Sequence, residues 1–307
     1  MQVQAQKKGI FYNYWKHRYL VLLFFPAIIY YAVFHYAPLY GVQIAFKNFI
    51  FRIGIMRSPW IGFENFRMLF SMGSFRDVLR NTVIISTYKL IFGFPAPILF
   101  AILLNEVRSI KFKKTVQTIS YLPHFVSWVI LGGMFMQILS PSTGPFNQML
   151  TGLGFKPIYF LGDKRWFRSV LVVTSIWKGI GWGSIVYLAS IAGINPELYE
   201  VAEIDGAGRF RKAISITLPS ITPVITIMFI FAVGGIIRDD FDQIFNLYNA
   251  GVYPVGDVLS TYTYRVGLVD MRYSFAAAVG LFTNVIGFAL VLITNTVVKR
   301  LNEYGLW

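Results

Sequence analysis

Few residues in this sequence are of types that carry out chemistry, and most of those lie inside or beside long apolar stretches. The 307 residues include no cysteine and three histidines. The lack of cysteine excludes disulfides, thiolate metal sites and cysteine nucleophiles. The sequence also contains neither an HExxH zinc motif nor a phosphate-binding loop of the form GxxxxGKS or GxxxxGKT. We therefore expect no catalytic residues, no metal site and no cofactor bound by this chain.

Ionisable residues within apolar stretches are the more informative group. Lys89 and Lys178 fall inside such stretches, and His124 lies near another. Charged groups at membrane depth are costly, and they usually face a bundle interior or a water-filled cavity. These residues either line a path for a polar solute or, alternatively, snorkel to an interface or pair within the bundle.

Three aspartates, Asp239, Asp240 and Asp242, cluster after another apolar stretch. They form a solvated acidic loop or, alternatively, contact a polar ligand or a partner protein. Trp177 and Trp182 lie beside Lys178 in sequence. Their rings suit stacking on a ligand or a place in the aromatic belt at a membrane surface.

Composition identifies the setting of these residues. Hydrophobic residues make up 56% of the chain and charged residues 14%, whereas soluble domains have about 45–50% and about 25%. This is the composition of an integral membrane protein. The net charge of +14 would suggest nucleic acid in a soluble chain, but no RNA-binding motif is present. Basic loops beside anionic lipid explain the charge, with membrane lipid as partner and no nucleic acid.

Six apolar segments are long enough to cross a bilayer as helices, which takes about 17–25 residues. They cover about 20–37, 81–104, 119–138, 168–191, 220–237 and 273–297. The first is longer than the core of a signal peptide, and Pro38 follows it directly, so we expect it to remain as a transmembrane helix. The sequence predicts an all-α, six-span integral membrane fold in which prolines and glycines permit close helix packing.

Both termini then lie on one side of the membrane. Cytoplasmic loops are enriched in Lys and Arg, and two basic clusters lie on the same side as the termini. These clusters are Lys7, Lys8, Lys16 and Arg18, and Arg108, Lys111, Lys113 and Lys114. We expect the N- and C-termini to be cytoplasmic. On the outer side, 60–80 has the spacing of an amphipathic helix, and 139–166 is rich in Gly and Pro and predicts a loop.

The inner segment between the fourth and fifth spans predicts a short helical hairpin at 195–219. Asn195 and Pro196 are typical of a helix start, and Gly206 is typical of a left-handed C-cap. A second short helix is expected over 209–216, stopped by Leu218–Pro219. Such a hairpin, tied to two spans, suits docking of a partner; an ordinary loop between spans is the alternative.

The same residues resemble a known motif. Glu200, Ala202 and Gly206, followed after nine residues by Ile216 and then Leu218–Pro219, match the EAA loop of binding-protein-dependent ABC importer permeases. Val201 replaces the first alanine of that motif. The resemblance continues through IFGFPAPILFAILLNE (91–106), KTVQTISYLPHFVSWV (114–129), YFLGDKRWF (159–167) and WGSIVYLASIAGINPELYE (182–200). These phrases are similar to permeases of oligo- and polysaccharide importers, including those for alginate.

The resemblance implies a type I ABC importer transmembrane domain, similar to the maltose importer, with a cytoplasmic coupling helix. It implies a second homologous permease, two ATPase subunits that use ATP and Mg, and an extracytoplasmic solute-binding protein, all at the bacterial cytoplasmic (inner) membrane. ATP-driven closure of the ATPases would act on the coupling helix and turn the cavity outward. The residues implied in coupling are Glu200, Ala202, Glu203, Asp205, Gly206, Ala207, Ile216, Leu218 and Pro219.

Within this frame the parts of the chain have expected roles. We expect a cytoplasmic segment at 1–19, a first transmembrane helix and outer segment at 20–80, the core permease domain at 81–299 and a cytoplasmic tail at 300–307. The candidates for the saccharide path are Lys89, Trp177, Lys178, Trp182, Asp239 and Asp240. An excess of basic residues in the outer segments fits alginate or another anionic sugar.

Two other classes remain alternatives. A membrane-embedded glycan or lipid enzyme would need convergent carboxylates, a metal site or a nucleophile with its base, and no such constellation stands out. A secondary transporter or channel would usually show internal repeats, and none is clear.

Overall fold

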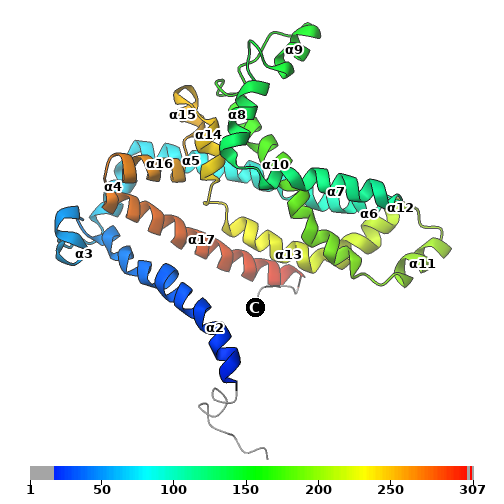
Figure 1. Ribbon diagram of the computed structural model, residues 1–307, viewed down its shortest axis with the longest axis horizontal. Helices are drawn as coiled ribbons and strands as arrows, with labels where there is room; N and C mark the ends of the chain where they lie inside the picture. The colour runs from blue at the N-terminus through cyan, green and yellow to red at the C-terminus, as the bar shows by residue number, and fades with distance from the viewer. Residues whose placement is uncertain (1–16, 303–304, 306–307) are drawn as a thin grey trace, which may run out of the picture.

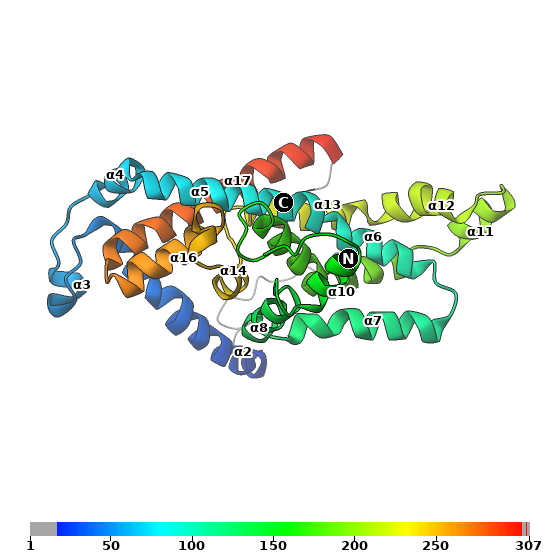
Figure 2. The ribbon, with the colours of Figure 1, turned by 90° about the horizontal axis from the view of Figure 1, so that it is seen from above.

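The computed structural model describes residues 17–302 and 305, and this part of the chain is almost entirely helical. Its extended pairing is limited to an isolated antiparallel bridge between Lys47 and Trp60. The long helices run along the long axis of the molecule (Figures 1 and 2), with α3 at one end and α11 at the other. Residues 1–16 of the expected segment 1–19, and half of the expected tail 300–307, lie outside the described residues.

Within the described part of the chain, five continuous helical segments are long and apolar enough to cross a membrane. Three contain π-helical or 3-10 turns between α-helical parts. In chain order the five are Arg18–Phe46 (α2, Arg18–Tyr31, with turns to Phe46), Gly73–Asn105 (α5, Gly73–Tyr88, a π turn Lys89–Gly93, and α6, Pro95–Asn105), Phe167–Ala192 (α10), Arg209–Gly234 (α12, Arg209–Lys212, a π turn Ala213–Thr217, and α13, Leu218–Gly234) and Tyr273–Arg300, within α17 (Tyr273–Asn302).

Shorter helices connect or cap these segments. They are α3 (Gly54–Arg57), α4 (Glu64–Ser71), α7 (Ile110–Phe125), α8 (Trp128–Ile138), α9 (Pro145–Gly152), α11 (Glu197–Ile204), α14 (Phe241–Leu247), α15 (Tyr253–Gly256) and α16 (Leu259–Tyr264, continued by a π turn Arg265–Val269). Helices α8 and α9 project sideways from the long axis (Figure 1).

The third predicted span, 119–138, is not one straight helix. It is formed by α7 and α8, which bend by 104° at Val126 and Ser127. Pro123 lies in the last turn of α7, and the Ser127 hydroxyl accepts the Ile130 N–H at 3.4 Å to cap α8. Val126 and Ser127 have extended backbone, and Ser127 caps the start of a separate helix, so α8 runs in a different direction from α7. Hydropathy alone reports the apolar length but not this bend.

Three other boundaries differ from the expectation. The second arm of the hairpin does not stop at Leu218–Pro219 but continues into α13, because the π turn before Pro219 shifts the hydrogen-bond register and lets the helix pass the proline. The segment 60–80 forms α4 and the start of α5, separated at Met72, instead of one amphipathic helix. The expected loop 139–166 contains α9.

The buried apolar side chains form three clusters. One joins α8, α10 and α14 around Phe167 and Ile244; one joins α4, α5, α16 and α17 around Phe75; and one joins α6, α10 and α13 around Ile221. Helix α10 packs closely on α7 at Gly181, where an added Cβ would lie 2.2 Å from the Ser120 carbonyl oxygen. The sequence expectation of close packing at a glycine of this span is confirmed there.

Helix α2 stands apart from these clusters. It buries no residue, and both views show it separated from the bundle over most of its length (Figures 1 and 2). Its exposed side chains are almost all apolar, including Leu23 at 78% and Phe24 at 64% exposure. This surface suits contact with lipid or another membrane helix.

Candidate translocation cavities and coupling hairpin

A polar cluster lies where the Gly73–Asn105 helix changes to its π turn. The Lys89 ammonium donates to the Gln243 side-chain oxygen. Gln243 is fully buried and donates from Nε2 to the Leu171 carbonyl at 2.7 Å and to the Thr174 hydroxyl at 2.8 Å. Helix α14 is thus joined to α10 and to the π turn by side-chain hydrogen bonds. Gln243 has no signal in the sequence beyond its place three residues after Asp240.

Asp239 and Asp240 complete this region. Asp240 accepts the Trp128 indole N–H at 3.1 Å and caps α14 by accepting the Gln243 N–H at 3.2 Å. The Asp239 carboxylate accepts the backbone N–H of Ser260 at 3.1 Å and the Ser260 hydroxyl. Both aspartates are therefore held in protein contacts rather than in a solvated loop.

Three of the six predicted path residues share one cavity. Lys89, Asp239 and Asp240 line a hollow of about 360 Å³ together with Ser86 and Arg238. A neighbouring hollow of about 210 Å³ reaches Lys89 from the side of α10. The structure thus brings together residues that are far apart in the chain, since Lys89 and its partner Gln243 are 154 positions apart.

The other three path candidates lie elsewhere. The Lys178 ammonium donates to the carbonyls of His124 at 3.0 Å and Val126 at 2.6 Å, at the bend between α7 and α8. Trp182 stacks on His124 with ring centroids 4.5 Å apart, and Trp177 meets the edge of Phe135. Lys178 therefore fastens the bend between two helices. This is the bundle-pairing alternative that the sequence left open.

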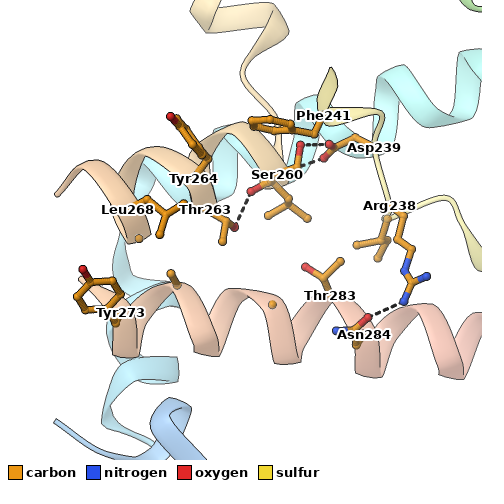
Figure 3. Close-up of a pocket in the computed structure, with 15 residues that line it drawn as sticks. Arg238, Asp239, Phe241, Ser260, Thr263, Tyr264, Leu268, Tyr273, Thr283 and Asn284 are labelled. Carbon is orange, nitrogen blue, oxygen red and sulfur yellow. Dashed lines mark hydrogen bonds between the residues drawn. The ribbon is translucent and has the colours of Figure 1, made fainter. Parts of the chain in front are cut away.

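A larger cavity of about 630 Å³ lies between α16 with its π turn, α17, and the segment 237–241 (Figure 3). Its labelled polar and aromatic residues come from all three elements. Arg238 and Asp239 border both this cavity and the smaller one. Sequence reasoning missed Arg238, although an arginine directly after an apolar span was a usable signal. It also missed Tyr264, Tyr273 and Asn284, which carry no local signal.

At the far end of the molecule, α11 and its turn form the predicted hairpin. Gly206 has φ = 76°, the left-handed conformation expected at the C-cap. The Ala207 N–H donates to the Ala202 carbonyl at 2.8 Å, and the Gly206 N–H donates to the Glu203 carbonyl at 3.0 Å. This pair of bonds is the Schellman motif, so the glycine ends the helix as the sequence predicts.

Two contacts tie the arms of the hairpin together. Glu203 forms an ion pair with Lys212, which lowers the pKa of the Glu203 carboxyl. The Tyr199 and Thr217 hydroxyls are 2.9 Å apart and hydrogen-bonded. Large apolar side chains nevertheless point outward, with Ile204 86% and Phe210 80% exposed. The hairpin is a braced element with an uncovered apolar tip.

The remaining coupling candidates surround these contacts. Glu200, Asp205 and Gly206 are exposed, Ala202 and Ala207 are half-buried, and Ile216, Leu218 and Pro219 lie where the π turn passes into α13. Among residues 17–302 and 305, no group of three or more His, Cys, Asp or Glu side chains is placed to hold a metal ion.

Comparison with known proteins assigns the fold. The profile of the family described as "Binding-protein-dependent transport system inner membrane component" matches residues 93–303. The chain belongs to this family. It is a permease component of an ABC importer, and hence a transport subunit rather than an enzyme. This membership decides against both alternatives left open by the sequence, the membrane enzyme and the secondary transporter.

Individual relatives of this permease cover nearly its whole length. It is 38% identical over 304 residues to the "Polygalacturonan/rhamnogalacturonan transport system permease protein YteP" of Bacillus subtilis (strain 168), covering 99% of this chain and 95% of that protein. One solved structure, of "a bacterial ABC transporter involved in the import of the acidic polysaccharide alginate", matches with a TM-score of 0.89 and 42% identity over 96% of this chain and all of the other.

A second solved structure is a "bacterial alginate ABC transporter in complex with alginate pentasaccharide-bound periplasmic protein". It matches with a TM-score of 0.89 and 41% identity, covering 97% of this permease and 100% of that chain. The all-α ABC importer permease fold expected from the sequence is thereby confirmed, with five candidate spans among the described residues, or six when the bent pair α7–α8 is counted as one.

Proposed function

We propose that this permease forms one half of the membrane path of an importer for acidic oligo- or polysaccharides, alginate being one candidate. A second homologous permease forms the other half, two ATPase subunits supply ATP hydrolysis with Mg, and an extracytoplasmic binding protein delivers the saccharide. The relatives named above and the basic excess of the outer segments support this substrate class.

The braced hairpin with its apolar tip carries the proposal. Exposed side chains as large as Ile204 and Phe210 mark an interaction surface when they cluster on one short element. The hairpin is continuous with α13 and follows α10 directly, so a partner that moves it also moves two helices that border the central cavities. The ATPase docks here, in our proposal, through the segment from Glu200 to Ala207.

The orientation follows from the same assignment. The ATPase lies in the cytoplasm, so the hairpin faces the cytoplasm, and both termini are on that side of the bacterial inner membrane. The bend between α7 and α8 and the projecting α9 then lie toward the outer side, where the binding protein arrives.

The test is the ATPase activity of the four-component complex reconstituted in lipid. Binding protein is added empty, loaded with a uronic acid oligosaccharide, or mixed with a neutral one. We expect stimulation only by the loaded protein. Failure of well-folded subunits to assemble, with no stimulation by any saccharide, would contradict the proposal.

A further inference from the structure

The 630 Å³ cavity (Figure 3) has the size and lining of a small-molecule site. Ligand sites typically measure about 300–1,000 Å³ and combine apolar walls with a few placed polar groups. Here Phe241, Tyr264 and Tyr273 provide aromatic surface, and Phe241 and Tyr264 contact each other with ring centroids 5.4 Å apart. Rings with such flat apolar faces suit the C–H face of a sugar ring, and the tyrosine hydroxyls suit its rim.

Arg238 places a positive charge on the wall of this cavity, next to the candidate membrane-spanning helix α17. Its Nη2 donates to the Asn284 side-chain oxygen at 2.8 Å. Asn284 is eleven positions after the first residue of α17, about 16 Å along a helix that rises 1.5 Å per residue. The guanidinium therefore lies beside the interior of the apolar segment Tyr273–Arg300, which is long enough to cross a membrane.

No protein carboxylate neutralises this charge within the described residues. The ion pairs found there are Lys212–Glu203 and Arg265–Asp257. The adjacent Asp239 turns the other way, and both of its oxygens accept hydrogen bonds from Ser260 on the α16 side (Figure 3). A charged side chain beside a membrane-spanning helix faces water or a polar ligand, because its exposure to lipid is unfavourable.

The guanidinium also has free donors. It carries five N–H groups, and across residues 17–302 and 305 its hydrogen bonding is limited to the one bond to Asn284. That bond fixes one edge of the group and leaves its other donors without a protein acceptor among the described residues. Guanidinium groups recognise carboxylates through paired N–H donors.

We propose that Arg238 is the residue by which the permease selects a saccharide that carries carboxylates, in the cavity between α16 and α17. Asn284 acts as a positioning residue that orients the guanidinium. This inference rests on the proposed function and adds a site and a recognition group to it. The uronate carboxylate meets the free N–H donors while the sugar ring lies against the aromatic wall.

Equilibrium binding to the purified complex without binding protein tests this, since the selectivity of the binding protein then plays no part. The probes are a uronic acid trisaccharide and its carboxyl-reduced neutral counterpart. We expect the wild type to prefer the uronate. Arg238→Gln should weaken uronate binding by about tenfold to hundredfold, the range for a hydrogen bond to a charged group, and leave the neutral sugar unchanged.

Arg238→Lys keeps the charge and should retain part of the preference. Arg76→Gln, the same change at an exposed arginine of α5 outside the cavity, is the matched control and should bind both sugars as the wild type does. Equal binding of both sugars by the wild type, or unchanged uronate binding by Arg238→Gln, would overturn the inference. The ATPase measurement tests the proposed function separately. If loaded binding protein stimulates the wild-type ATPase, the proposed function holds even when the inference about Arg238 is wrong; if it does not, the proposed function itself is wrong.

Discussion

Polar side chains at membrane depth in this permease fall into two kinds. Lys178 donates to carbonyls at the bend between α7 and α8, and Gln243 is likewise enclosed. Lys89, Asp239 and Arg238 instead border open cavities. Residue type does not separate the two kinds, since both include a lysine. The distinction lies in whether packing encloses the side chain or leaves it on the wall of a cavity, since Lys89 and Asp239 also make hydrogen bonds to protein groups.

At this scale we predict that Lys178→Met destabilises the protein without changing its saccharide preference. The substitution removes the donor of two short hydrogen bonds and leaves carbonyls at a helix break unpaired, at a cost of about 1–3 kcal/mol. Thermal unfolding of the purified complex measures this. Trp177→Phe, one position away on the same helix, is the control and should unfold nearly as the wild type does. A stable Lys178→Met variant with altered preference would return Lys178 to the saccharide path.

The coupling hairpin is held in shape by a helix cap and by an ion pair between its arms. In the hairpin α11–α12, Gly206 in the left-handed conformation ends α11. The Glu203–Lys212 ion pair joins the two arms. An added Cβ at Gly206 would meet nothing within 4 Å. The glycine is therefore required by backbone conformation rather than by lack of space within this chain.

We expect Gly206→Asp to impair docking of the ATPase. Aspartate tolerates the left-handed region better than most residues, so the effect comes mainly from a side chain and a charge added beside the apolar tip of the hairpin. The readout is retention of the ATPase through purification, together with turnover. Gly208→Ala is the matched control, because Gly208 has φ = −70° and open space around its Cα. Normal retention and turnover in Gly206→Asp would show that the turn tolerates distortion.

The hairpin also has a predictable response to pH. Lys212 lowers the pKa of the Glu203 carboxyl, first through its hydrogen bond and then through its charge. Because the pKa is lowered, the stabilisation from the Glu203–Lys212 ion pair is fully present above the ordinary pKa of glutamate, about 4.3. It is lost as the pH falls through the lowered pKa of the folded protein. A spin label at Phe210 should therefore become more mobile in strong acid. Glu203→Gln should show the mobile signal already at neutral pH, and identical pH profiles for both proteins would count against the brace.

Helix α16, which lines the 630 Å³ cavity, and helix α11 of the coupling hairpin lie toward opposite ends of the long axis (Figure 1). The polar cluster and the 630 Å³ cavity lie around the break between α13 and α14, while α11 lies at the end of the bundle. Helices α10 and α13 connect the two regions. Movement of the hairpin is therefore transmitted as movement of whole helices, which suits alternating exposure of a central cavity.

This arrangement predicts a topology that can be measured directly. Because the sequence has no cysteine, single cysteines give clean labelling. Cysteine at Ile204, 86% exposed on α11, should react with a membrane-impermeant reagent only after the cells are permeabilised, and cysteine at Phe155, 63% exposed beyond α9, should react in intact cells. The chain is expressed without its ATPase, so that Ile204 is uncovered. The reversed pattern would invert the proposed orientation.

Features that depend only on neighbouring residues could be predicted from the sequence. Apolar length located the spans, Gly206 located the end of α11, and the EAA-like spacing located the hairpin, since helix capping and hydrophobic length are local properties. Lys89, Asp239 and Asp240 were also singled out, because an ionisable residue beside an apolar run is visible without a structure.

The way these elements meet depends on packing between helices and required the three-dimensional structure. The bend between α7 and α8, the burial of Gln243 and the pairing of Arg238 with Asn284, 46 positions away, depend on which helices pack together and at what depth. In a membrane bundle a polar group is satisfied by whichever neighbour the packing brings near it. Periodicity along one helix does not specify that neighbour, so the sequence left two alternatives open for Lys178 and did not single out Arg238.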